Sequence, residues 1–171
     1  MSKINKTPDF LKMWKQLRQD LIEIAATEGE NFFHSSFDKE GFTDVAFEPW
    51  QKRKDTLDYK IITHTGFLRN SVQTFEKSLN RIVFGSDAEY SEIHNEGGTL
   101  TIQVTAKSKR FFWAMYKATG KGIWKAMALT KKTHFVVKMP KRQFIGESKT
   151  LLDKLDKILT SEITERFNNL K

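Results

Sequence analysis

Four ionisable side chains lie close together and form the strongest candidate for acid–base or metal chemistry. Glu89, Glu92 and Glu96 recur at three- and four-residue steps beside His94, so a helix here would place them near one another. Such a cluster could hold Mg²⁺ or Mn²⁺. A solvated acidic face is the more common explanation of this pattern. We therefore expect no metal site, and we expect His94 to be hydrogen-bonded at the edge of the core.

Other catalytic chemistry finds little support in the residue types. The 171-residue chain has no cysteine, which excludes disulfides, thiolate nucleophiles and cysteine-bound zinc. No nucleophile-elbow or phosphate-loop pattern occurs, and His34, His64 and His134 are isolated in the sequence. We expect a protein that is not an enzyme and that binds no cofactor.

Residues 106–131 are unusual because aromatic side chains alternate with cations and glycines. Three uses are open: an interface with another protein, a surface that contacts phosphates and stacks on bases, or a helix packed into its own core. We favour a protein interface, in a basic aromatic insertion or arm, and keep nucleic-acid binding as the alternative. The expected interface residues are Arg110, Phe111, Trp113, Tyr116, Lys117, Lys121, Trp124 and Lys125.

The charge of the chain favours an acidic partner. There are 29 Lys and Arg residues against 21 Asp and Glu, a formal net charge of +8, and residues 105–142 contain no acidic residue. No run approaches the ~18 consecutive apolar residues of a membrane helix, so we expect no membrane partner. The start of the chain shows no secretory signal pattern.

The elements that would carry this segment follow from the spacing of apolar residues. A stripe from Phe10 to Phe37 predicts a long helix that opens at Thr7-Pro8-Asp9, with a possible kink near Gly29. A second stripe predicts a C-terminal helix over 151–167.

Between the helices, β-prone runs predict a hairpin over 72–76 and 81–85 and strands over 99–104 and 134–138. Residues 38–62 read as a long loop with one short strand at most, anchored by Trp50. We expect one domain over 1–171 of class α+β, with two long amphipathic helices packed on an antiparallel sheet of about four strands.

Several short motifs occur in a fixed order along residues 8–165. They are Thr65-Gly66-Phe67-Leu68-Arg69-Asn70-Ser71, then Val83-Phe84-Gly85-Ser86 with Tyr90, His94 and Gly97-Gly98, and last Arg142-Gln143-Phe144-Ile145-Gly146. In this order the chain resembles the Mu-like phage virion-morphogenesis proteins, which complete the tail or join it to the head. It departs from them in Gln143, where a proline is common, and in the long aromatic segment 106–131.

The resemblance implies a structural role in a phage or prophage particle. It implies a virion component made and assembled in the host bacterial cytoplasm, with tail or neck (connector) subunits as partners and a homo-oligomeric ring in the particle. The motif residues read as scaffold, since glycines lie at junctions between elements and Thr65 and Ser71 can satisfy backbone donors. These structural residues are Thr65, Gly66, Leu68, Ser71, Gly85, Tyr90, His94, Gly97, Arg142, Phe144 and Gly146.

Overall fold

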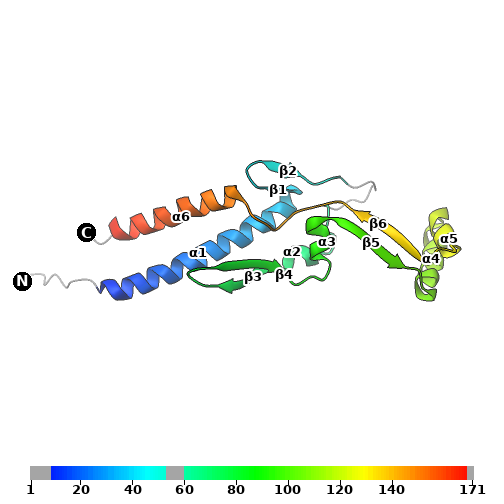
Figure 1. Cartoon of the computed structure of the whole chain (residues 1–171), viewed down its shortest axis with the longest axis horizontal. Helices are drawn as coiled ribbons and strands as arrows, with labels where there is room; N and C mark the ends of the chain where they lie inside the picture. The colour runs from blue at the N-terminus through cyan, green and yellow to red at the C-terminus, as the bar shows by residue number, and fades with distance from the viewer. Residues whose placement is uncertain (1–8, 53–59, 169–171) are drawn as a thin grey trace, which may run out of the picture.

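A 30-residue helix, α1 (Phe10–Lys39), forms the spine of an elongated molecule in the computed structural model, which describes residues 9–52 and 60–168. A second long helix, α6 (Lys149–Asn168), lies antiparallel beside it (Figure 1). Ion pairs between Glu28 and Lys154, at 2.6 Å, and between Asp20 and Arg166, at 2.7 Å, join the two helices. Such exposed pairs contribute little stability, but they fix which turns of the helices lie side by side.

Two details of α1 differ from the sequence-based expectation. The Asp9 carboxylate accepts the Lys12 backbone N–H at 3.0 Å, so Asp9 is the cap and the helix begins at Phe10. Residues 7 and 8 lie outside the described part. The helix also runs through Gly29 as one element. A Cβ on Gly29 would lie 2.1 Å from the Phe84 ring, so this glycine allows close packing against a strand and does not mark a kink.

Six strands in the described residues form three separate antiparallel pairs, which corrects the expected four-stranded sheet. The pairs are β1 (Gly41–Thr43) with β2 (Phe47–Pro49), β3 (Val72–Lys77) with β4 (Ile82–Ser86), and β5 (Gly98–Gln103) with β6 (His134–Met139). The predicted hairpin and the two later strands are confirmed, but helix α3 (Ser91–Glu96) turns the chain away before β5 and separates the pairs. Residues 38–62, expected as a loop, contain the first pair.

The core lies where the C-terminal end of α1 meets β1, β3 and the segment before α6. Phe37 and Phe144 are its two largest fully buried side chains, with ring centroids 5.0 Å apart. Trp50 packs edge-on against Phe37 and donates its Nε1–H to the Gln143 carbonyl at 2.8 Å. Trp50 therefore anchors its segment, as the sequence predicted. The class α+β is confirmed, but the long helices pair with each other and share one core with small strand pairs.

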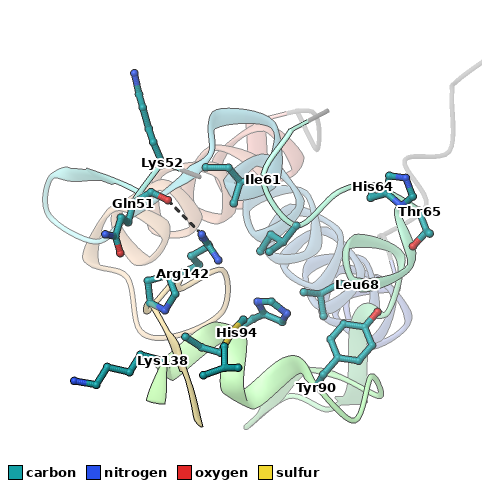
Figure 2. Close-up of a pocket in the computed structure, with 14 residues that line it drawn as sticks. Gln51, Lys52, Ile61, His64, Thr65, Leu68, Tyr90, His94, Lys138 and Arg142 are labelled. Carbon is teal, nitrogen blue, oxygen red and sulfur yellow. Dashed lines mark hydrogen bonds between the residues drawn. The ribbon is translucent and has the colours of Figure 1, made fainter. Parts of the chain in front are cut away.

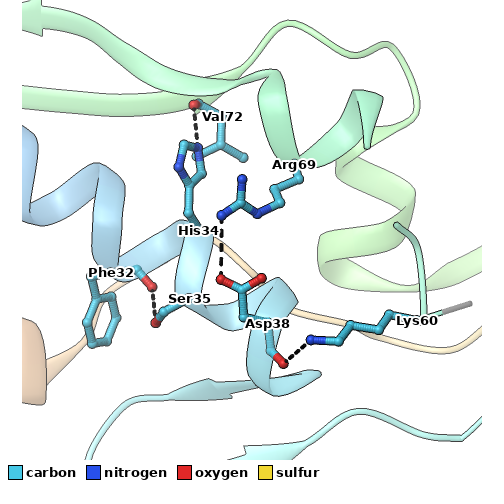
Figure 3. A network of polar contacts seen from close by, with 7 residues as sticks. All are labelled: Phe32, His34, Ser35, Asp38, Lys60, Arg69 and Val72. Carbon is cyan, nitrogen blue, oxygen red and sulfur yellow. Dashed lines mark hydrogen bonds and ion pairs between the residues drawn. The ribbon is translucent and has the colours of Figure 1, made fainter. Parts of the chain in front are cut away.

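A polar network ties the end of α1 to the short helix α2 (Phe67–Asn70) and to β3 (Figure 3). Arg69 pairs with the Asp38 carboxylate at 3.4 Å, and the Lys60 ammonium donates to the Asp38 carbonyl at 2.9 Å. The His34 Nε2 lies 3.1 Å from the Val72 carbonyl oxygen. His34 is isolated in the sequence, but in the fold it bridges two elements.

Candidate docking arm

Residues 98–139, hereafter the arm, extend from the core at the end of the molecule opposite the start of α1 (Figure 1). Strands β5 and β6 pair from Gly98↔Met139 to Gln103↔His134 and form a ribbon. Helices α4 (Ala106–Thr119) and α5 (Gly122–Ala128) sit at its far end. The basic aromatic segment predicted over 106–131 is therefore a helical hairpin carried on a two-stranded support.

One face of the ribbon is apolar, and three of its four side chains are exposed. Leu100 is opposite Val137 and Ile102 is opposite Phe135, so these four side chains share one face of the pleat. Leu100, Ile102 and Val137 are 36%, 50% and 37% exposed. Because an isolated two-stranded ribbon is marginally stable in water, an uncovered apolar face on such a ribbon favours a partner that covers it.

Helices α4 and α5 at the far end of the arm, hereafter the tip, have a small core of their own. Thr105 and Ser108 form a reciprocal capping box at the start of α4. Phe112 is buried, stacks on Trp124 at 6.1 Å and meets Phe135 of β6 edge-on at 6.2 Å. Trp124, predicted as an interface anchor, thus packs mainly inside the tip, which the alternation of aromatics and lysines in the sequence could not reveal.

The outer surface of α4 presents the other predicted interface residues. Arg110, Trp113 and Lys117 are spaced three and four residues apart, so they share one helical face, and all three are exposed. Phe111 is 53% exposed and Trp113 is 36% exposed. The partly buried Tyr116 contacts Trp113 at 6.0 Å and lies under the Lys125 ammonium at 5.8 Å. Lys121 and Lys125 are exposed nearby on the same tip.

The arm carries the whole net positive charge of the chain. It contains no Asp or Glu and nine cations: Lys107, Lys109, Arg110, Lys117, Lys121, Lys125, Lys131, Lys132 and Lys138. The chain has 29 basic and 21 acidic residues in all, so the remainder holds 20 and 21 and is nearly neutral. Within the described part of the chain, none of the nine forms an ion pair, whereas cations outside the arm (hereafter the body), such as Lys77 and Lys154, do.

Helix α3 clamps the base of the arm. The His94 carbonyl accepts the Arg142 backbone N–H at 2.8 Å, and the Asn95 side-chain oxygen accepts the N–H groups of Phe144 and Ile145 at 2.9 and 3.0 Å. Gly97 has φ of +73°, and a Cβ there would lie 2.6 Å from the Lys141 nitrogen. The two chain segments of the base are thus held in close contact. Sequence reasoning missed Asn95, because nothing local marks an amide whose partners lie about fifty positions later.

The motif residues behind the family resemblance gather around this base. Leu68, Ser71 and Phe144 are buried, and the Ser71 and Ser86 hydroxyls are 2.6 Å apart. The Thr65 hydroxyl accepts the Phe67 N–H at 3.3 Å, as expected. Ser71 differs from the expectation, since its hydroxyl donates to the Leu68 carbonyl at 2.7 Å. Gly66 before α2 and Gly146 before α6 lie at junctions, as expected. Gly85 does not: it lies within β4, where a Cβ would be 2.4 Å from the Phe75 ring, so it allows close packing of that ring.

Several of the same residues line a pocket of about 1010 Å³ beside the base (Figure 2). Thr65, Leu68, Tyr90, His94 and Arg142 contribute to its wall. The His94 ring meets Tyr90 edge-on at 5.8 Å, and its buried Nδ1 has no hydrogen-bond partner among the described residues. The prediction that the His94 ring is hydrogen-bonded is therefore wrong for its Nδ1 atom. Burial, and secondarily the charge of Arg142, hold the pKa of His94 below its ordinary value, so the ring favours the neutral form.

The acidic residues near His94 do not converge on a metal site. Glu89, Glu92 and Glu96 are exposed, and Glu96 lies 3.8 Å from the Lys141 ammonium. Residues 9–52 and 60–168 contain no group of three side chains placed to hold a metal ion. No described helix combines the length and apolar character needed to cross a bilayer.

Comparison with models of protein families, with curated proteins and with solved structures finds no match to this chain.

Proposed function

We propose that this chain is a structural assembly protein of a phage or prophage tail or head–tail junction, which acts by docking its arm on neighbouring subunits. The observation that carries the proposal is the arm itself, an apolar ribbon and a basic aromatic tip held away from the core. Such a surface is costly to leave in water and gains stability when a partner covers it.

The arm is suited to docking because it is supported at both ends. The clamp of α3 on residues 142–145 fixes its base, and the Phe112 core orders its tip. A preordered surface loses less conformational entropy on association than a flexible segment would. Exposed Phe111 and Trp113 supply apolar contact area, and the surrounding cations steer an acidic partner.

The resemblance to virion-morphogenesis proteins supports the choice of an assembly role. Its motif residues Leu68, Ser71, Arg142 and Phe144 build the base from which the arm projects. Subunit docking requires a scaffold that holds one surface towards a neighbour, and this base does so. The pocket lined by His94 has no carboxylate among its described lining residues.

The proposal is tested on particles from the strain that encodes the chain. Purified particles are analysed by mass spectrometry and antibody labelling, for the wild type and for the double variant Phe111→Ser, Trp113→Ser. We expect the wild type at the tail or neck in a fixed copy number, and a folded variant that is absent from particles. Particles that lack the wild-type chain, or that form normally after deletion of its gene, would overturn the proposal.

Nucleic-acid binding is the second candidate, and the observation that favours it is the set of nine arm cations around exposed aromatic rings, none of which forms an ion pair with a described residue. Affinity for a short DNA duplex and a single strand is measured by fluorescence anisotropy at increasing salt. A steep loss of affinity with salt, together with weaker binding by Lys117→Glu, would support this alternative. Absence of binding at micromolar DNA and low salt would remove it.

A further inference from the structure

An acidic groove with an apolar floor lies at the base of the arm. It has a volume of about 430 Å³ and is lined by Tyr90, Ile93 and Leu100 together with Glu89, Glu92, Glu96 and Gly97. A groove of this size is large enough for an aromatic side chain. Its rim is acidic, and residues 82–106 contain four acidic residues and no Lys or Arg.

Groove and tip are complementary in charge and in apolar character. Glu89 and Glu92 form no ion pair with any described residue, and the same holds for the nine cations of the arm. At the tip, Arg110 and Lys117 flank the exposed Trp113 on one face of α4. The order of groups on this face is therefore cation, indole and cation, which matches an apolar groove between carboxylates.

The two surfaces of one chain cannot meet. Six paired residues of β5 and β6 separate them, and a strand rises about 3.3 Å per residue, so the tip lies roughly 20 Å from α3. The ladder continues past the strands, with the Val104 N–H bonded to the Thr133 carbonyl at 2.8 Å, which keeps the ribbon extended (Figure 1). The complementary surfaces can be joined only between two copies.

We infer that the α4 face of one copy docks in the α3 groove of the next copy, with Trp113 over Ile93 and Leu100 and with Arg110 and Lys117 facing Glu89 and Glu92. The inference rests on the proposed function and names its partner. Because Leu100 belongs both to the groove and to the apolar face of the ribbon, the docked tip also begins to cover that face. The two surfaces differ, so the contact is head-to-tail and repeats from copy to copy.

Charge reversals on each surface test this pairing by sedimentation velocity over a concentration series at low salt. The tip variant is Arg110→Glu, Lys117→Glu, and the groove variant is Glu89→Lys, Glu92→Lys. We expect wild-type self-association that weakens with salt, and a loss of about tenfold or more in affinity for each variant alone. An equimolar mixture should associate again with the two variants alternating, because the intact tip meets the intact groove and the two reversed surfaces also carry opposite charges. A chain with all four reversals should associate again.

The matched control is Lys12→Glu, Lys15→Glu on exposed α1, which changes the net charge as the tip variant does and should leave association unchanged. Thermal midpoints of all variants show whether they are folded. Wild-type protein that stays monomeric at millimolar concentration and low salt would overturn the inference. Association lost in Trp14→Ser but kept in the tip and groove variants would also overturn it, by assigning the contact to the apolar groove between α1 and α6.

The two proposals fail separately. If the chain is found at the tail or neck but both charge reversals leave its association unchanged, the assembly role stands and this contact is excluded. A chain that pairs as predicted but never enters a particle keeps the contact and loses the assembly role.

Discussion

The side-chain oxygen of Asn95 accepts the backbone N–H of Phe144 at 2.9 Å, so α3 holds the segment that returns from the arm to the core. Phe144 in turn packs on Phe37 of α1, with 5.0 Å between ring centroids. This chain of contacts connects the position of the arm to the best-packed part of the molecule. Changes at its members should therefore alter both the stability of the body and the orientation of the arm.

Replacing Asn95 by alanine should lower the free energy of unfolding by about 2 kcal/mol, because two part-buried N–H groups lose their acceptor. Urea unfolding followed by tryptophan fluorescence measures the change. Asn95→Asp keeps an acceptor oxygen and should recover most of the loss. Equal stability of the alanine variant and the wild type would show that these hydrogen bonds contribute nothing net.

Gly97→Ala should destabilise the chain by about 1–3 kcal/mol, since the φ of +73° at residue 97 and the nearby backbone nitrogen of Lys141 both oppose a Cβ. Gly122→Ala is the matched control. A Cβ at Gly122 has no neighbour within 4 Å and the residue begins α5, so alanine should be neutral or stabilising by about 0.5 kcal/mol. Thermal unfolding of both variants checks the pair, and the prediction fails if they shift the midpoint equally.

Phe112→Ala should unfold the tip and leave the body folded. Phe112 supplies the ring that Trp124 and Phe135 contact, and truncating a buried phenylalanine costs about 3 kcal/mol. Hydrogen exchange should show lost protection over 106–131 and unchanged protection in α1. Phe111→Ala removes an exposed ring and should alter neither region. Lost protection in α1 would show that tip and body unfold together.

Stability should decrease as pH falls below neutrality, in part through His94. Burial and Arg142 hold the pKa of His94 in the folded chain below its ordinary value of 6.5, so the unfolded chain takes up this proton first. The free energy of unfolding therefore falls as pH drops from about 7 towards the folded pKa. Unfolding midpoints of the wild type and His94→Gln at pH 7.5 and 5.5 measure this, and the variant should show the smaller change. A variant with the larger change would contradict the lowered pKa.

The sequence determined the elements well, because apolar periodicity reflects which face of a helix or strand is buried. The stripes from Phe10 to Phe37 and over 151–167 became α1 and α6, and the β-prone runs became β3 to β6. The sequence also predicted the positive charge of the arm, since residues 105–142 contain no acidic residue.

The tertiary structure alone decided which elements meet. Local spacing does not encode whether two hairpins join into one sheet, and here α3 and Gly97 direct β5 away from β4. Local spacing also could not show that Trp124 packs inward while Trp113 faces out. Nor could it show that Asn95 accepts hydrogen bonds from a segment about fifty residues later. These outcomes depend on contacts between residues distant in sequence, whose energies are set only when the chain is folded.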